Sequence, residues 1–491
     1  MTKYKTCAII GSGIGGMAAA IRLAAKGYHV DVYESNTNAG GKIRQINAKG
    51  YRFDMGPSII TLPHLIDELF DLHDKNPRDY FNYTQLEKPF KYFFSDGLII
   101  NSFSDVNKFS DEIEKKTKDT KENFKRYLKN IKIKYDITKP VFIESPIHRF
   151  TDYLKKKFLY GMVNFHKIDA FTTMDKGNKH YFEDPHLIEL LNYYATYVGS
   201  NPFKAPATLN VIPHLEINLG IFIPDKGIYA IIEALKQLAD EVGVKFHFNT
   251  RVDEIIVENK IAKGIRINEI IKEYNVVVSN MDVYFTYQKL LPHNKGPQRI
   301  LNQQKSSSVI CFYWGIKSEF QEMELHNMFF SNNQNEEFNT VFENKTIYND
   351  PTLYIYISSK HIEKDAPKGS ENWFVLTNVP NNEGQNWDEL KIKSRKFAVE
   401  KVNKLLNTDI EKHIEFEESI YPPSIEMDYS SAFGSVYGNS SNNKFAAFLR
   451  HANFSRKIKN LYFVGGSVHP GAGIPMCLNS AKIMEHVLTK K

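Results

Sequence analysis

The chain has 491 residues, of which 42% are hydrophobic and 24% charged, as in an ordinary folded protein of about two or three domains. Lys and Arg outnumber Asp and Glu by only 63 to 57, so the charge predicts no nucleic-acid partner. The cysteines Cys7, Cys311 and Cys477 are widely spaced and form no CxxC pair. This excludes a disulfide framework, and we predict no metal site.

The N-terminal part follows the order strand, glycine-rich loop, helix, strand. Apolar residues 6–10 predict a buried strand, the alanine-rich segment 17–26 a helix, and 29–33 a second strand that ends at Glu34. The loop reads Gly11-x-Gly13-x-x-Gly16, which permits a tight turn and a close approach of a diphosphate to the helix N-terminus. Because Glu34 can accept hydrogen bonds from a ribose, the pattern predicts a dinucleotide site.

A second glycine-rich turn, Ala39-Gly40-Gly41-Lys42, comes directly after the second strand. The glycine pair would let another loop approach the same diphosphate, and Lys42 would supply a positive charge. Simple NAD dehydrogenases do not need this feature, whereas flavoproteins with a glycine doublet have it. The turn therefore favours FAD over NAD.

The middle of the chain alternates between helical and strand-like segments. The charged residues 108–139 predict one or two surface helices, and 185–215 a helical region broken by prolines. Short apolar segments within 244–280 predict closely spaced strands, and further strands are expected at 353–358 and 373–379.

The C-terminal region combines a strand at 461–464 with a glycine- and proline-rich loop that ends at Pro475. We expect a final helix to begin near Cys477. Such a loop exposes backbone N–H groups, which can stabilise negative charge on a reduced flavin ring.

These motifs together resemble bacterial phytoene-desaturase-type carotenoid desaturases. The resemblance rests on GxGxxG…E…GGK, on FDMGPSI at 53–59 and on VGGSVHPGAGIP at 464–475, and it covers essentially the whole chain. Within this family, YVGSNPFKAPATL (197–209) and MGPSIITLP (55–63) are most similar to 1′-hydroxycarotenoid 3,4-desaturases.

The resemblance implies a mixed α/β fold. A Rossmann-type FAD-binding domain of the glutathione-reductase-like and amine-oxidase-like class would carry an inserted substrate domain. We expect the FAD-binding domain to combine residues 1–90, 225–290 and 440–491. The substrate domain would combine 91–224 and 291–439 and include a helical, membrane-facing part.

The resemblance also implies which residues bind FAD. They are the diphosphate loop Gly11, Ser12, Gly13, Ile14, Gly15 and Gly16; Glu34 and Ser35 at the ribose; Gly40, Gly41 and Lys42 near the diphosphate; Gly56, Pro57 and Ser58 at the isoalloxazine; Val252 at the adenine; Asn280 near the cofactor; and Gly466, Ser467, Gly473, Ile474 and Pro475 at the ribityl chain and ring.

The implied activity is FAD-dependent desaturation, in which a long polyene loses a hydride and a proton and gains a conjugated double bond. No general base is assigned, because His469 and Asp54 are interpreted as structural residues beside the ring. Cys477 is interpreted as a small residue at a helix start rather than a covalent flavin attachment.

Several alternatives stay open at this point. The chain could be a phytoene or diapophytoene desaturase, or a carotene oxygenase, isomerase, saturase or amine oxidase. It could also be a non-enzymatic escort protein for prenyl groups, although the intact GGK turn and C-terminal loop argue against this.

Residues 147–167 mix Lys155, Lys156 and Lys157 with aromatic and aliphatic residues. This predicts either a helix that rests on a membrane surface or a solvated helix of the substrate domain. No segment approaches the ~18 apolar residues of a spanning helix, and the N-terminal sequence lacks the features of a signal peptide. We therefore expect a cytoplasmic protein, attached peripherally to the inner face of the cell membrane, with a carotenoid substrate. The oligomeric state is left open.

Overall fold

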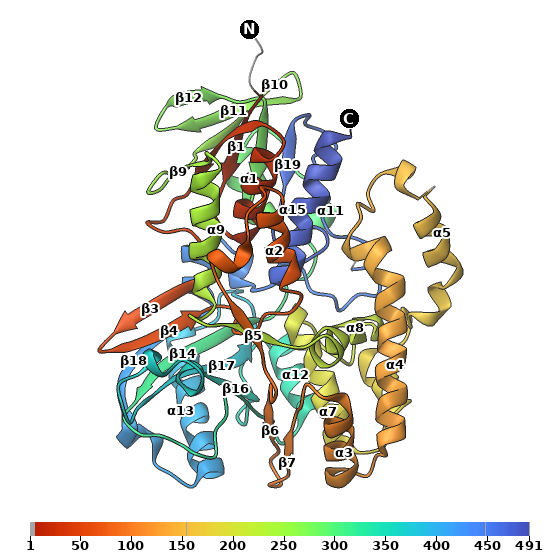
Figure 1. Ribbon diagram of the computed structural model, residues 1–491, viewed down its shortest axis with the longest axis vertical. Coiled ribbons are helices and arrows are strands. Elements are labelled where there is room, and N and C mark those ends of the chain that lie inside the picture. The colour runs from red at the N-terminus through yellow and green to blue at the C-terminus, as the bar shows by residue number, and fades with distance from the viewer. Residues whose placement is uncertain (1–4, 154, 447, 491) are drawn as a thin grey trace.

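The computed structural model describes residues 5–153, 155–446 and 448–490, and Figure 1 shows its arrangement. A parallel sheet of strand order β19-β13-β1-β2-β9 stands in the upper half. Its strands come from the beginning, middle and end of the chain, so distant segments of the sequence meet in one sheet. They are β1 (Lys5–Ile10), β2 (Tyr28–Tyr33), β9 (Lys245–His247), β13 (Val276–Ser279) and β19 (Leu461–Phe463).

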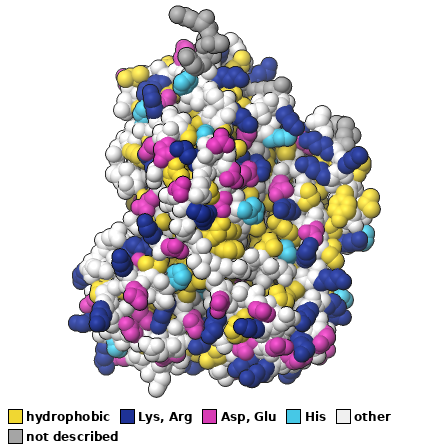
Figure 2. All heavy atoms as spheres, viewed as in Figure 1, with side chains coloured by type: hydrophobic (Ala, Val, Ile, Leu, Met, Phe, Trp, Pro, Cys, Tyr) yellow, Lys and Arg dark blue, Asp and Glu magenta, His cyan; other side chains and the backbone are white. Residues whose placement is uncertain are grey.

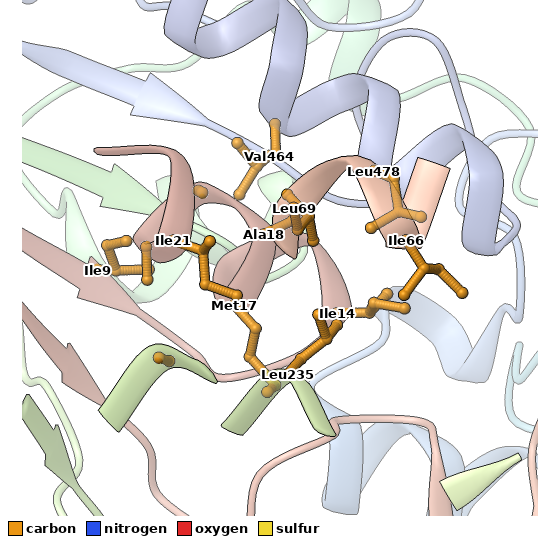
Figure 3. Close-up of a cluster of buried hydrophobic side chains, with 14 of the residues drawn as sticks. Ile9, Ile14, Met17, Ala18, Ile21, Ile66, Leu69, Leu235, Val464 and Leu478 are labelled. Atoms are coloured by element: carbon orange, nitrogen blue, oxygen red, sulfur yellow. The ribbon is translucent and has the colours of Figure 1, made fainter. Parts of the chain in front are cut away.

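Helices α1 (Ile14–Ala24), α2 (His64–Asp71), α9 (Tyr229–Glu241) and α15 (Ile474–Thr489) pack around this sheet. Figure 3 shows apolar side chains of these helices meeting at α1, which is buried along its whole length apart from its last residue. Arg22 of α1 is 3% exposed and pairs with Glu68 of α2 at 2.7 Å and Glu485 of α15 at 3.2 Å. One buried guanidinium thus links three helices.

A second, seven-stranded sheet lies in the lower half, in the order β18-β14-β17-β16-β15-β6-β7. Alternate residues of its central strands enter two separate apolar clusters, one of which also contains α13 (Trp387–Leu406). Its strands are β6 (Lys91–Phe93), β7 (Ile99–Asn101), β14 (Ser308–Ile316), β15 (His326–Phe329), β16 (Leu353–Ile357), β17 (Glu371–Val379) and β18 (Ile414–Ile420).

A group of helices covers the other face of the seven-stranded sheet, in the lower right of Figure 1. It contains α3 (Val106–Lys116), α4 (Lys121–Thr138) and α7 (Pro185–Tyr193), and α5 (Lys156–Val163) projects at its side. Within the described residues, no helix combines the length and hydropathy needed to cross a bilayer. The remaining elements are β3 (Arg44–Ala48), β4 (Tyr51–Met55), β5 (Tyr83–Gln85), β8 (Phe222–Pro224), β10 (Glu254–Glu258), β11 (Ile261–Ile267), β12 (Ile270–Glu273), α6 (Met174–Lys179), α8 (Val211–Pro213), α10 (Val283–Phe285), α11 (Gln298–Leu301), α12 (Gln334–Phe342) and α14 (Pro422–Tyr429).

Two expected elements differ from those observed. The final helix begins at Ile474 rather than near Cys477, because the loop already ends at Gly473, whose φ is +104°. Segment 147–167 is not one amphipathic helix: its α-helical part is α5 alone, which is followed at Asn164 by a turn held by hydrogen bonds to Tyr160. Residue 154 of that segment lies outside the described residues. The proposed domain boundaries stay a prediction.

Candidate active site

The two glycine-rich turns of the N-terminal part lie against each other. Gly13 forms a parallel bridge with Gly40, and the Gly40 N–H donates to the Ser12 carbonyl at 3.0 Å. A Cβ atom on Gly41 would come within 3.0 Å of the Gly13 Cα, and one on Gly16 within 2.2 Å of the Gly11 carbonyl oxygen. Side chains at these positions would therefore push the backbone apart. The glycines let the two glycine-rich turns pack directly against each other.

Two helix N-termini are open in this part of the fold. Gly13 and Gly473 precede α1 and α15, and neither helix receives a hydrogen bond from a capping side chain. A Cβ on Gly473 would meet no atom within 4 Å. The first N–H groups of such helices carry partial positive charge and suit an anionic ligand such as a diphosphate.

Glu34 is buried at the end of β2 and faces the first turn. Its carboxylate accepts hydrogen bonds from the Ser12 backbone N–H at 2.9 Å and the Ser12 hydroxyl at 2.8 Å, and a longer one from Ser35 at 3.4 Å. The Thr250 N–H donates to the Glu34 carbonyl at 2.8 Å, which brings the buried Val252 into the same region. The residues expected at the ribose and the adenine therefore lie together.

Asn280 lies behind the glycine loop. Its N–H donates to the Ile10 carbonyl at 2.8 Å. A Cβ on Gly13, on Gly15 or on Gly465 would come within 2.8 Å of its side-chain amide. These three glycines are thus explained by the close packing of one amide. The need for a glycine at position 465 in particular was invisible in the sequence, because Asn280 is distant along the chain.

Lys42 lies between the two halves of the molecule. Its Nζ donates to the Val436 carbonyl at 2.8 Å and more weakly to Ser435. Burial lowers the pKa of Lys42, and the neighbouring Asp282 opposes this shift. The ammonium group is thus directed toward segment 435–436, and its role near the diphosphate stays a prediction.

The segment expected at the isoalloxazine is anchored to the seven-stranded sheet. Gly56 has a φ of +92°, and a Cβ there would come within 2.2 Å of the Lys42 carbonyl oxygen. Ser58, which is half-buried, shares a 2.6 Å hydrogen bond with the Tyr354 hydroxyl, which lies 2.7 Å from Nδ1 of His326. Burial lowers the pKa of His326 to about 3, so its imidazole is neutral.

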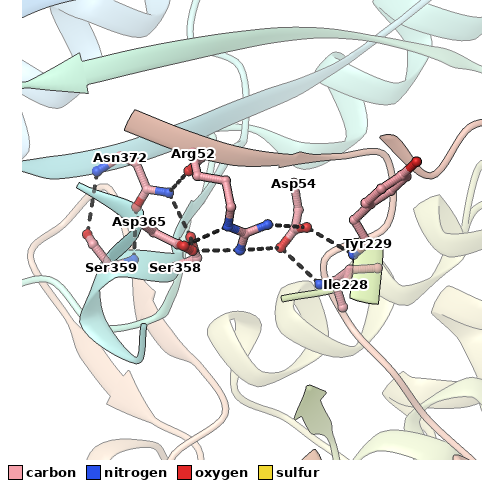
Figure 4. Close-up of polar contacts among 8 residues, drawn as sticks. All are labelled: Arg52, Asp54, Ile228, Tyr229, Ser358, Ser359, Asp365 and Asn372. Carbon is pink, nitrogen blue, oxygen red and sulfur yellow. Dashed lines mark hydrogen bonds and ion pairs between the residues drawn. The ribbon is translucent and has the colours of Figure 1, made fainter. Parts of the chain in front are cut away.

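Asp54 holds backbone, as the sequence interpretation expected. Figure 4 shows its carboxylate between Arg52 and the start of α9, where it accepts from the N–H groups of Ile228 at 3.0 Å and Tyr229 at 3.1 Å. Arg52 bridges it to Asp365, with a 2.6 Å contact to the latter and 2.9 Å to Asp54. A carboxylate fixed in this way is a structural link between two halves of the fold.

His469 and Cys477 are also unsuited to proton or covalent chemistry. His469 is fully buried, contacts the Ser145 carbonyl through Nε2 at 2.8 Å, and has a pKa lowered by burial to about 3. Burial raises the pKa of the Cys477 thiol to about 11. The first therefore remains neutral imidazole and the second remains a thiol.

A buried aromatic cluster lies under the Ser58 segment. It includes two tyrosines that bind Glu216, a residue that is 5% exposed and accepts hydrogen bonds from the hydroxyls of Tyr194 at 2.6 Å and Tyr197 at 3.1 Å. Burial raises the pKa of Glu216 to about 7. Glu216 was not predicted from the sequence, although an acidic residue inside an apolar region interrupted by prolines was a signal. A small cavity in the cluster is lined by Phe90, Tyr92, Leu190, Tyr193, Tyr194, Tyr197, Met328 and Phe330.

The residues present fit a flavin adenine dinucleotide. Paired glycine turns and open helix N-termini suit its diphosphate, and a buried acid at the end of β2 suits its ribose. The family model for flavin containing amine oxidoreductases matches residues 14–483. The chain belongs to this family. It is a flavin-dependent oxidoreductase, and its cofactor is FAD.

The relatives place the chain among carotenoid-modifying flavoproteins. It is 45% identical over 98% of both chains to a 1-hydroxycarotenoid 3,4-desaturase from a Flavobacterium species. It is 32% identical to a 4,4′-diapolycopene oxygenase from a Methylomonas species, over 97% of this chain and 96% of the relative. A cyclohexylamine oxidase from Brevibacterium oxydans has the same fold, with a TM-score of 0.62, 13% identity and 99% coverage of both chains.

Proposed function

We propose that this protein is an FAD-dependent carotenoid desaturase that forms the 3,4 double bond of a 1-hydroxycarotenoid. The observation that carries the proposal is the 45% identity over nearly the full length to an enzyme of that name. In such a reaction one carbon loses a hydride and its neighbour a proton, and FAD supplies the hydride acceptor.

In this reaction the protein has to bind the substrate, align it with the flavin and exclude water from the site. The aromatic cluster beneath the half-buried Ser58 is apolar and largely buried, so we propose that the polyene approaches the expected ring position from this side. We propose that FAD contacts the residues named in the sequence analysis, with its diphosphate at Gly11–Gly16 and its ring at Gly56–Ser58 and Ile474–Pro475.

The test is a side-by-side incubation of FAD-loaded protein with hydroxylated and non-hydroxylated carotenoids in liposomes. We expect the 1-hydroxycarotenoid to lose two hydrogens and to absorb at longer wavelength. Oxygen gain would identify an oxygenase, and preference for phytoene would identify an early desaturase. Either result would contradict the proposed reaction.

We further propose that α5 and the following turn dock the protein on the inner face of the cell membrane, where a water-insoluble carotenoid would be found. Four residues of α5 project apolar side chains into solvent: Leu159 is 51% exposed, Tyr160 51%, Met162 58% and Val163 73%. Figure 2 shows apolar side chains gathered at the right edge, over α5, with cationic side chains around them. Apolar groups that enter an interface beside lysines are typical of peripheral attachment.

A further inference from the structure

Desaturation releases a proton, and the structure narrows the groups that could accept it. His326 and His469 have pKa values lowered to about 3, and Asp54 is held by Arg52 and two backbone N–H groups. Among the described residues, four carboxyl groups that are buried or half-buried have a raised pKa: Glu189, Glu216, Asp282 and Glu337.

Three of these four groups have cations nearby. Asp282 lies near Lys42 and Lys305 and accepts from the Tyr284 N–H at 2.8 Å. Glu337 accepts from Thr352 at 2.7 Å and, like Glu189, lies near Lys401. A carboxylate next to lysines is a weak base, because the positive charge stabilises its ionised form.

Glu216 has different surroundings. Of the described groups, only the hydroxyls of Tyr194 and Tyr197 oppose the effect of its burial, and no charged side chain takes part. Its own charge raises the pKa of four tyrosines on the packed elements, namely Tyr92, Tyr194, Tyr197 and Tyr354. A carboxylate held only by phenols retains basicity near neutral pH, where a general base is most effective.

Backbone pairing ties Glu216 to the expected ring segment. The Phe222 N–H donates to the Ile60 carbonyl at 2.9 Å, which joins the segment after Glu216 to the segment after Ser58. Tyr354 bonds Ser58 at 2.6 Å and lies in the same apolar cluster as Tyr194, which donates to Glu216. Glu216 and Ser58 therefore face the same aromatic cluster from neighbouring elements.

We propose that Glu216 is the proton acceptor of the desaturation and that Tyr194 and Tyr197 are its positioning residues. This inference rests on the proposed function. One C–H bond of the substrate would break, and its hydrogen would leave with both bonding electrons as a hydride, for which FAD would be the acceptor. The adjacent C–H bond gives its proton to the Glu216 carboxylate, and its electron pair becomes the second bond of the new double bond.

The main test is the rate of anaerobic flavin reduction in FAD-loaded protein mixed with 1-hydroxycarotenoid in liposomes. For the wild type we expect the rate to rise with pH through about 7, because only the ionised Glu216 accepts a proton. Glu216→Gln keeps the size and removes the base, so it should lower the rate by about 100-fold or more and abolish this pH dependence. FAD content should stay unchanged.

Tyr194→Phe tests the positioning role through the pH dependence of the flavin reduction rate, which loss of a merely structural residue would not shift. Loss of a donor to the carboxylate destabilises its charged form and raises the pKa of Glu216. The rise of the flavin reduction rate with pH should therefore shift to higher pH, while FAD content is retained. Glu189→Gln is the matched control, because Glu189 is a half-buried acid with a raised pKa that is not among the groups shifting the pKa of Glu216. It should leave this pH dependence in place.

Infrared difference spectra between acid and neutral pH provide a second readout, independent of turnover. The carbonyl band of a neutral carboxyl group that disappears on raising the pH through about 7 should be missing in Glu216→Gln. If Glu216→Gln keeps both the rate of flavin reduction and its pH dependence, the inference is overturned. A raised KM with unchanged kcat would also overturn it, because such a change indicates a role in binding alone. A wild type that removes no hydrogen from the hydroxycarotenoid would instead overturn the proposed function.

Discussion

At the scale of single residues, hydrogen bonds link groups that the sequence keeps far apart. Glu34 is the clearest case, because its carboxylate joins the end of β2 to the first glycine turn through Ser12. Any ligand at that turn would therefore be sensitive to this acid, both through its charge and through the loop geometry.

Glu34→Ala should weaken FAD binding more than it changes the chemistry. The ribose would lose a charged hydrogen-bond acceptor worth about 1.5–3 kcal/mol, which corresponds to more than tenfold in Kd. Titration of apoprotein with FAD measures this, and saturating FAD should largely restore turnover. Glu258→Ala, at the exposed end of β10, is the control. Equal FAD affinity in Glu34→Ala and the control would contradict the ribose role.

Ser58→Trp tests the expected ring position. A bulky side chain at this half-buried position should block the substrate while the diphosphate turns still hold FAD. We expect Ser58→Trp to show a normal flavin spectrum but to form no product. Ser58→Ala should retain both the flavin spectrum and product formation. Normal turnover in the tryptophan variant would place the reaction elsewhere.

At the scale of elements, the proposed membrane docking would depend on α5. Lys155 pairs with Asp152, and Lys157 bonds Ser145, so within the basic run Lys156 is the exposed member. The exposed apolar face of α5 is therefore a stronger candidate for the docking contact than the three lysines. No local sequence pattern distinguished this exposed face from a packed one.

Leu159→Ser combined with Val163→Ser should reduce sedimentation with anionic liposomes several-fold, because each removes exposed apolar area from the interface. Ile392→Ser with Ile270→Ser removes equally exposed apolar groups elsewhere, at 69% and 65% exposure, and serves as the control. If both pairs sediment like the wild type, the docking surface lies outside α5.

The helices around the parallel sheet depend on Arg22. Arg22→Met would remove the buried partner of Glu68 and Glu485, which would keep the more exposed Lys482 and Lys26, and should cost about 1.5–3 kcal/mol of unfolding free energy. A lowered thermal midpoint, compared with Arg395→Met on the more exposed part of α13, would show this. Equal midpoints for the two variants would mean that packing alone holds the three helices.

At the scale of the whole molecule, the sequence predicted the nucleotide-binding part far better than the rest. Glycine spacing, the strand-helix-strand order and Glu34 act locally, so a sequence pattern reveals them. Strand β14 was missed, whereas the equally buried β16 was expected, because an unbroken apolar run does not by itself distinguish a strand from a buried helix. Glu216 was missed because its partners arrive through the tertiary fold.

The central claim is that the two halves of the molecule combine a flavin with a 1-hydroxycarotenoid for desaturation. Its most direct test is anaerobic mixing of FAD-loaded protein with that carotenoid in liposomes, followed together by flavin absorbance and product mass. We expect one flavin to be reduced for each product molecule that is lighter than the substrate by two hydrogens. Flavin that stays oxidised, or a product that forms only with oxygen and gains an oxygen atom, would contradict it.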